Sequence, residues 1–232
     1  MARLTRLCLP GTPQHIIQRG TNRQACFAST EDFSAYAYWL HKYSREYHID
    51  IHAWVFMTNH VHLLATPDSP HGISKLMQTL GRHYVRYFNH TYRRTGTLWE
   101  GRFRSCVVDA EEYLLKCQRY IELNPVRANM VSTPDEYLWS SYHANGLGKS
   151  TALWTPHNAY LALGTTPSQR TQAYRELFAG HYDAAELQQI REAANQGMVL
   201  GNDRFKREIE TLSGRRVTPL RRGPKPRRDD GQ

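Results

Sequence analysis

The sequence predicts an α+β fold, with an antiparallel sheet covered by helices on one face. Segments rich in β-branched and aromatic residues alternate with segments whose apolar residues recur at helical spacing. Up to Leu123 the order is strand, helix, strand, strand, helix, strand, helix, which is typical of α+β sandwiches. The hydrophobic content of 40% over 232 residues is enough to build the core of one sizeable domain and a smaller appendage.

Four strands are expected, each next to turn residues. The first ends at the Gly20-Thr-Asn turn, and the second and third flank the Thr58-Asn59 turn. Their predicted ranges are 15–19, 48–57, 61–66 and 105–109.

Three helices are expected between and after these strands. Ser29 or Thr30 can cap the first, and the third stops before Asn124-Pro125 because a residue that precedes proline is pushed out of the α region. Their predicted ranges are about 30–47, 72–90 and 110–123.

Beyond Val131 the pattern becomes helical. A capping box at Thr133-Pro-Asp-Glu136 comes first, and residues 145–150 resemble a linker. Later helices are expected at 155–164, 168–179, 183–196 and 202–212, with Gly164, Gly180, Gly197 and Gly214 as their stops. The chain therefore divides into a main domain at 1–145, a helical accessory domain at 151–214 and a basic flexible tail at 215–232.

The formal charge of +9 indicates a polyanionic partner, and the charge is uneven. Residues 215–232 hold seven basic and two acidic residues, so this tail carries +5. The four cysteines form no zinc spacing and are expected to be reduced thiols. With no signal peptide or membrane-length apolar run, a cytoplasmic location near the nucleoid is expected.

His60-Val61-His62 is a candidate metal site. On a strand, residues two apart point to one face, so the two imidazoles are spaced to share one ion. Two surface histidines on a half-buried strand are the ordinary interpretation of the pair taken alone.

Tyr120 and Asn124 lie four residues apart and hence on one face of the expected helix. That spacing presents a phenol hydroxyl and an amide oxygen together. A core tyrosine and a helix stop before proline are the structural interpretation of the same residues.

Three blocks together resemble the REP-associated tyrosine transposases, a single-tyrosine branch of the HUH endonucleases. In this chain the blocks are Ala53-Trp-Val-Phe-Met-Thr-Asn-His-Val-His62, Leu98-Trp-Glu-Gly-Arg-Phe-Arg104 and Arg119-Tyr-Ile-Glu-Leu-Asn-Pro-Val-Arg127. They follow the family's order, and the resemblance covers about residues 5–145. It implies a ferredoxin-like HUH catalytic domain in this region.

The resemblance also implies a mechanism. Tyr120 would be the nucleophile, and His60, His62 and Asn124 would hold Mg²⁺ or Mn²⁺. The partner would be single-stranded DNA with hairpins formed by repetitive palindromes, and cleavage would leave a 5′-phosphotyrosine and a free 3′-hydroxyl. No nucleotide cofactor is expected because the covalent link conserves the bond energy. A monomer and a homodimer both remain open.

Basic residues outside this set are candidate DNA contacts. The arginines expected to hold phosphates are Arg93, Arg94, Arg102 and Arg104, with Arg221 and Arg222 in the tail. The aromatic residues of 84–88, at helical spacing, are expected in the core instead.

Two other functions compete with a strand-transferring endonuclease. One is a non-catalytic binder of structured repetitive DNA, and the other is a metal hydrolase that uses water. Glu100 and Asp109 are possible bases for such chemistry, although a structural role is expected for each. Tyr113, seven residues before Tyr120, is the rival nucleophile.

Overall fold

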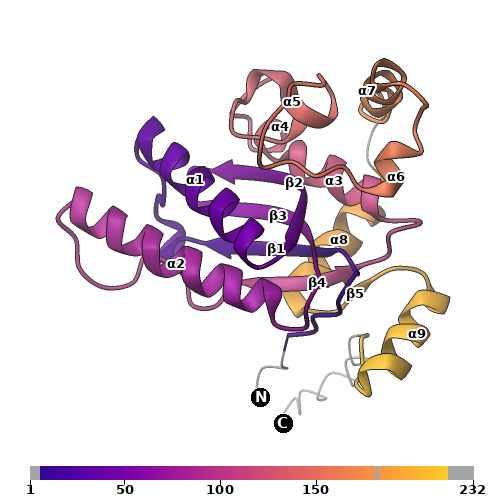
Figure 1. Ribbon diagram of the computed structural model, residues 1–232, viewed down its shortest axis with the longest axis horizontal. Helices are drawn as coiled ribbons and strands as arrows, with labels where there is room; N and C mark the ends of the chain where they lie inside the picture. The colour runs from indigo at the N-terminus through magenta and orange to yellow at the C-terminus, as the bar shows by residue number, and fades with distance from the viewer. Residues whose placement is uncertain (1–5, 181–182, 219–232) are drawn as a thin grey trace, which may run out of the picture.

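A computed structural model describes residues 6–180 and 183–218 of the chain. Its centre is a five-stranded sheet in the order β2-β3-β1-β4-β5 (Figure 1). Neighbours among β1 to β4 pair antiparallel, and β5 runs parallel to β4. The strands are β1 Gln14–Arg19, β2 Ile49–Met57, β3 His60–Pro67, β4 Arg104–Val108 and β5 Val199–Leu200. The predicted α+β class is confirmed, while β5 was not predicted from the sequence.

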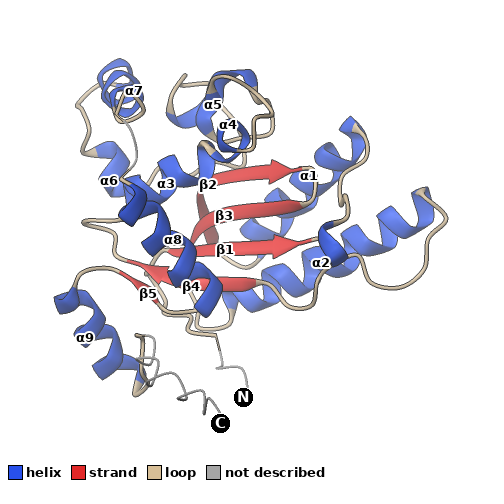
Figure 2. Ribbon diagram, turned by 180° about the vertical axis from the view of Figure 1, so that it is seen from behind, coloured by secondary structure: helices blue, strands red, loops and turns tan. Residues whose placement is uncertain are grey.

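Helices cover both faces of the sheet, so their predicted placement on one face is wrong. Figure 1 shows α1 and α2 together on the near side, and Figure 2 shows α3 and α8 across the other side. These helices are α1 Thr30–Glu46, α2 Gly72–Thr91, α3 Leu114–Glu122 and α8 Ala184–Gln196. The physical reason lies in β2, which is buried at every position except Asp50. A strand that is apolar on both sides needs cover on both sides.

The two faces receive alternate side chains of β3. Val61, Leu63 and Ala65 lie in the apolar core beneath α1 and α2. Leu64 lies in the separate core beneath α3 and α8. Because side chains alternate along a strand, His60 and His62 share the face of Leu64.

Part of the predicted accessory domain is built into the main sheet. Ile190 and Ala194 of α8 pack in the same core as Val55 and Leu64, and β5 extends the sheet beyond β4. The boundary between the two domains at residues 145–151 stays a prediction. The remaining helical segments are η1 Thr21–Arg23, α4 Asn124–Arg127, η2 Pro134–Glu136, α5 Tyr142–Asn145, α6 Asn158–Leu161, α7 Pro167–Glu176 and α9 Asp203–Ser213.

Local signals set several helix ends. Ser29 and Asp32 form a capping box at the start of α1. Gly197 and Gly214 follow α8 and α9 with φ of 66° and 63°, the left-handed conformation that ends a helix. The predicted positions of these ends are confirmed.

The first residues of the predicted tail pack against the sheet. Val217 is buried, and its carbonyl accepts a hydrogen bond of 3.1 Å from the Val199 amide. Arg221 and Arg222 lie outside the described residues.

The length and apolar character of the helices decide whether any of them could cross a membrane. Over residues 6–180 and 183–218, none of them combines the length and the apolar character needed to span a membrane.

Candidate active site

Two histidines lie side by side on β3, between β2 and β1. The ring centroids of His60 and His62 are 5.0 Å apart. In the sheet register, Ile17 of β1 lies opposite His62 and Arg19 lies opposite His60. The placement of both imidazoles on one face, predicted from their spacing, is confirmed.

A hydrogen bond at Nδ1 orients each of these rings. His60 Nδ1 lies 2.6 Å from Asn59 Oδ1, and His62 Nδ1 lies 2.8 Å from His15 Nε2. Within the described part of the chain, Nε2 of each ring has no hydrogen-bond partner. A ring held through one nitrogen with the other nitrogen free is the arrangement of metal-ligating histidines. The pair therefore fits a bound metal ion.

Burial keeps both imidazoles neutral. It lowers the pKa of His60 to about 4, and the charge of Arg19 adds to the effect. It also holds the pKa of His62 well below its ordinary value, with smaller contributions from His15 and His60. Neutral imidazole is the form that binds a metal ion, so both rings are ready to bind at neutral pH.

Tyr120 of α3 lies against these histidines. Its ring centroid is 5.9 Å from that of His62 and 5.7 Å from that of His15, edge-on in both cases. The guanidinium of Arg127 lies 4.3 Å from the centre of the Tyr120 ring and donates to the Tyr120 carbonyl at 2.7 Å. The fold thus brings the predicted nucleophile beside the predicted metal ligands.

Asn124 begins α4, one turn after Tyr120. Its Nδ2 donates to the carbonyls of Tyr120 and Ile121, at 3.1 Å each. These bonds orient the amide and leave Oδ1 without a partner among residues 6–180 and 183–218. In the same residues, no group of three or more His, Cys, Asp or Glu could hold a metal ion. An ion on the histidine pair would therefore need a ligand such as the Asn124 amide oxygen.

Tyr113, the rival nucleophile, lies against α8 instead. Its hydroxyl donates to Gln189 at 3.4 Å, and the ammonium of Lys116 lies 4.9 Å from its ring centre. No ring contact joins Tyr113 to a histidine in the described chain. The geometry therefore favours Tyr120 over Tyr113.

The four candidate arginines of the described chain divide into two pairs. Arg102 and Arg104 line a small cavity with Arg19 and Glu100, and Arg104 lies opposite Ile17 on the histidine face. The Arg104 guanidinium donates to Asn195 of α8 at 2.6 Å. This pair therefore lies near the histidines.

Arg93 and Arg94 follow the end of α2. The Arg94 guanidinium lies 5.5 Å from the ring centre of Phe88, within the layer of α1 and α2. These two arginines therefore belong to the other side of the sheet.

The two acidic candidates differ in exposure. Asp109 is buried and accepts a hydrogen bond of 3.0 Å from the Glu111 amide at the start of the turn before α3. Glu100 is exposed, and its amide donates to the Arg19 carbonyl at 2.8 Å. The contacts of Asp109 agree with the structural role expected for it.

Three residues at this site were not predicted from the sequence: His15, Arg19 and Arg127. His15, Ile17 and Arg19 lie two residues apart along β1 and therefore share one face of the sheet. This alternation was the one signal in the sequence that could have placed His15 and Arg19 together. Their approach to the histidine pair depends on the pairing of β1 with β3, which the sequence does not display.

Comparisons with known proteins agree with this geometry. Residues 10–124, about half of the chain, match the family described as Transposase IS200 like. The resemblance drawn from the sequence blocks is confirmed, and the chain belongs to the IS200-like transposase family. Comparison with curated proteins gives no match.

Two solved structures are similar to this chain. The structure of a REP-associated tyrosine transposase bound to a REP hairpin is 20% identical, with a TM-score of 0.52, and the match covers 68% of this chain and 93% of that one. A Deinococcus radiodurans R1 protein regarded as a transposase is also 20% identical, over 53% of this chain and 93% of its own, with a TM-score of 0.35. The first of these likenesses supports the fold.

Proposed function

We propose that this protein is a metal-dependent endonuclease and strand transferase that cleaves single-stranded DNA near hairpins. The observation that carries the proposal is the contact of the Tyr120 ring with His62, beside two imidazoles that each keep Nε2 free. Membership of the IS200-like transposase family supports DNA as the substrate. The REP hairpin bound in the structurally similar transposase supports a hairpin partner. A cytoplasmic site of action near the nucleoid is part of the proposal.

Tyr120 supplies the nucleophile in this proposal. Its hydroxyl oxygen attacks the phosphorus and its proton leaves to water, while the bond from phosphorus to the 3′ oxygen breaks. The leaving oxygen takes up a proton and becomes a free 3′-hydroxyl, and the 5′ phosphate stays on the tyrosine. Attack by a 3′-hydroxyl on this phosphotyrosine rejoins a strand without an external energy source.

His60, His62 and the oxygen of Asn124 would hold Mg²⁺ or Mn²⁺, both of which accept mixed nitrogen and oxygen ligands. A bound divalent ion supplies neutralisation and polarisation of the scissile phosphate. Asn59 and His15 fix the rotation of the two imidazoles, so that the free nitrogens stay in place. Arg127 holds the ring and the backbone of Tyr120.

The direct test uses end-labelled single-stranded DNA that carries a hairpin with single-stranded flanks. Incubation with the full chain and Mn²⁺, followed by a denaturing gel, should show one fragment linked to the protein through its 5′ phosphate and another with a free 3′-hydroxyl. Chelation by EDTA should remove both products. Tight hairpin binding with intact DNA would instead indicate a non-catalytic DNA-binding protein, and cleavage without a protein-linked product would indicate hydrolysis by water.

A further inference from the structure

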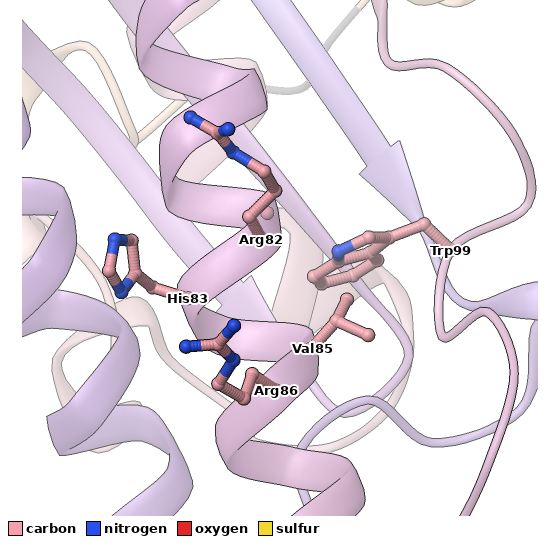
Figure 3. Close-up of a pocket in the computed structure, with 6 residues that line it drawn as sticks. Arg82, His83, Val85, Arg86 and Trp99 are labelled. Carbon is pink, nitrogen blue, oxygen red and sulfur yellow. The ribbon is translucent and has the colours of Figure 1, made fainter.

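A cavity of about 670 Å³ lies beside α2, in the layer of helices that covers the sheet face opposite His60 and His62. Its volume falls within the ~300–1,000 Å³ typical of small-ligand sites. The lining residues are Gly81, Arg82, His83, Val85, Arg86 and Trp99. Figure 3 shows two arginines that extend from α2 and, beside the helix, the indole of Trp99 next to Val85.

Gly81 opens this cavity. It lies in the middle of α2, where glycine destabilises a helix relative to alanine. Apart from the neighbouring residues and backbone of α2 itself, a Cβ atom at this position would meet only the indole nitrogen of Trp99 within 4 Å among the described residues, at 3.8 Å. Neither a left-handed backbone nor crowding explains this glycine, whereas access to the indole edge does.

Trp99 brings an unpaired donor to the cavity. Its side chain is buried, at 6% exposure, and its Nε1 has no acceptor among the described residues. A buried donor left unpaired is unfavourable, and an acceptor atom on a ligand would relieve that cost. The indole is held in place by stacking on Tyr84, with centroids 5.9 Å apart.

Arg82 and Arg86 supply positive charge one helical turn apart. Both are exposed, and neither forms an ion pair with another residue of the described chain. Arg82 makes one long hydrogen bond, of 3.4 Å, to Thr79. The sequence of α2 contains no Asp or Glu to neutralise these arginines. The cavity therefore combines two available guanidinium groups with a buried N–H donor.

We propose that this cavity binds a phosphodiester segment of the DNA substrate, as an anchoring site on the face opposite the nucleophile. The two guanidinium groups contact phosphate oxygens. A small movement of the indole, whose Nε1 is closed off in this structure, lets its N–H donate to a further oxygen of the same nucleotide. Val85 and the indole edge offer an apolar wall to the sugar. This inference rests on the proposed function for the identity of the partner. It adds a binding site that lies apart from His60, His62 and Tyr120.

Fluorescence anisotropy with a labelled single-stranded DNA hairpin tests the anchor, with the full chain in EDTA so that no cleavage occurs. Arg82→Ala/Arg86→Ala should weaken binding by about 10-fold or more and reduce the slope of log K against log salt by roughly 1.4–1.8. Gly81→Leu fills the cavity with a good helix former and should weaken binding to a similar extent. Arg191→Ala/Arg207→Ala, which removes the same charge from exposed positions of α8 and α9, is the matched control.

Unchanged affinity and salt slope in the Arg82/Arg86 variant would overturn the anchoring site. An equal loss in the Arg191/Arg207 control would also overturn it, because general charge would then account for the effect. Adduct formation with Mn²⁺ at saturating DNA is measured in parallel and should persist in the cavity variants. Failure of the wild-type protein to form an adduct contradicts the proposed reaction, and the affinities in EDTA still decide on the anchoring site.

Discussion

Strand β3 divides its side chains between two contrasting environments. On the side of α1 and α2, Leu63 lies among aromatic rings such as Tyr36 and Phe56, whose centroids are 5.2 Å apart. On the side of α3, His62 meets Tyr120 and His15 at centroid distances of 5.9 and 5.0 Å. The ring spacing is similar on both sides, but the second side presents ring nitrogens and nearby arginines.

The comparison teaches that one strand presents an apolar set of side chains to one face and the proposed chemical set to the other, through alternate residues. A shift of the register by one residue would exchange the two sets of side chains, so the apolar core on one face fixes the position of the histidines on the other. Substitutions on the two faces should therefore have separable effects.

The largest effect is expected on cleavage, from His60→Ala on the chemical face. His60 is only half-buried, so the variant should stay folded and bind hairpin DNA. Loss of a ligand to the proposed metal ion would remove several kcal/mol of transition-state stabilisation, so cleavage should fall about 10²–10³-fold. His90→Ala, which removes an exposed histidine of α2, should cleave normally in the same gel assay. Full activity of His60→Ala, or of the wild type in EDTA, would contradict a metal on this pair.

Leu63→Ala should show the opposite behaviour. Leu63 is fully buried, and its truncation should lower the free energy of unfolding by about 2–5 kcal/mol through lost contacts and a cavity. Urea unfolding measures this loss, and His60→Ala should cost under about 1 kcal/mol in the same measurement. Similar losses in the free energy of unfolding of the two variants would contradict the assignment of stability to one face of β3 and chemistry to the other.

Glu122 allows a smaller test beside the chemical face. Ser141, Asn145 and Tyr174 all donate to this carboxylate, yet burial is the larger effect and raises its pKa to about 7. A raised carboxyl pKa stabilises the fold below the unfolded value near 4.5, and this contribution is lost as the pH rises through about 7. As the pH rises from 4.5 to 8, the free energy of unfolding of the wild type should therefore fall relative to that of Glu122→Gln. The fall should be about 1.4 kcal/mol for each tenfold difference in the proton affinity of Glu122 between the folded and unfolded states. Parallel stability curves for the two proteins between pH 4.5 and 8 would contradict this account.

The smallest effect is expected from the basic C-terminal segment. Because Val217 is buried, the informative truncation ends at Thr218 rather than before Arg215. Residues 219–232 hold five basic and two acidic residues, so their removal should weaken hairpin binding a few-fold and flatten its salt dependence. An unchanged salt slope would show that these residues do not contact DNA.

Local patterns predicted much of the chemical face. The spacing of His60 and His62 along a strand indicated one shared face, and the four-residue spacing of Tyr120 and Asn124 indicated one helical face. The family-like blocks then suggested that these two pairs meet, and the contact between Tyr120 and His62 agrees.

Non-local pairing could not be predicted in the same way. The hydrogen bond of His15 to His62 spans 47 residues and depends on the register of β1 against β3. Strand β5 has two residues, too few to show any period, and it is held by parallel pairing with β4. The cavity beside Gly81 depends on the loop that carries Trp99 back onto α2, which helical periodicity does not reveal.

Peptide mapping of the protein–DNA adduct tests the central claim most directly. The wild-type protein is trapped on single-stranded hairpin DNA with Mn²⁺, digested and analysed by mass spectrometry. Tyr120 lies against His62, while the Tyr113 hydroxyl contacts Gln189. The account predicts a nucleotide-bearing peptide that contains Tyr120, no adduct in Tyr120→Phe and normal adduct formation in Tyr113→Phe. A nucleotide on Tyr113, or an adduct that survives in Tyr120→Phe, would contradict it.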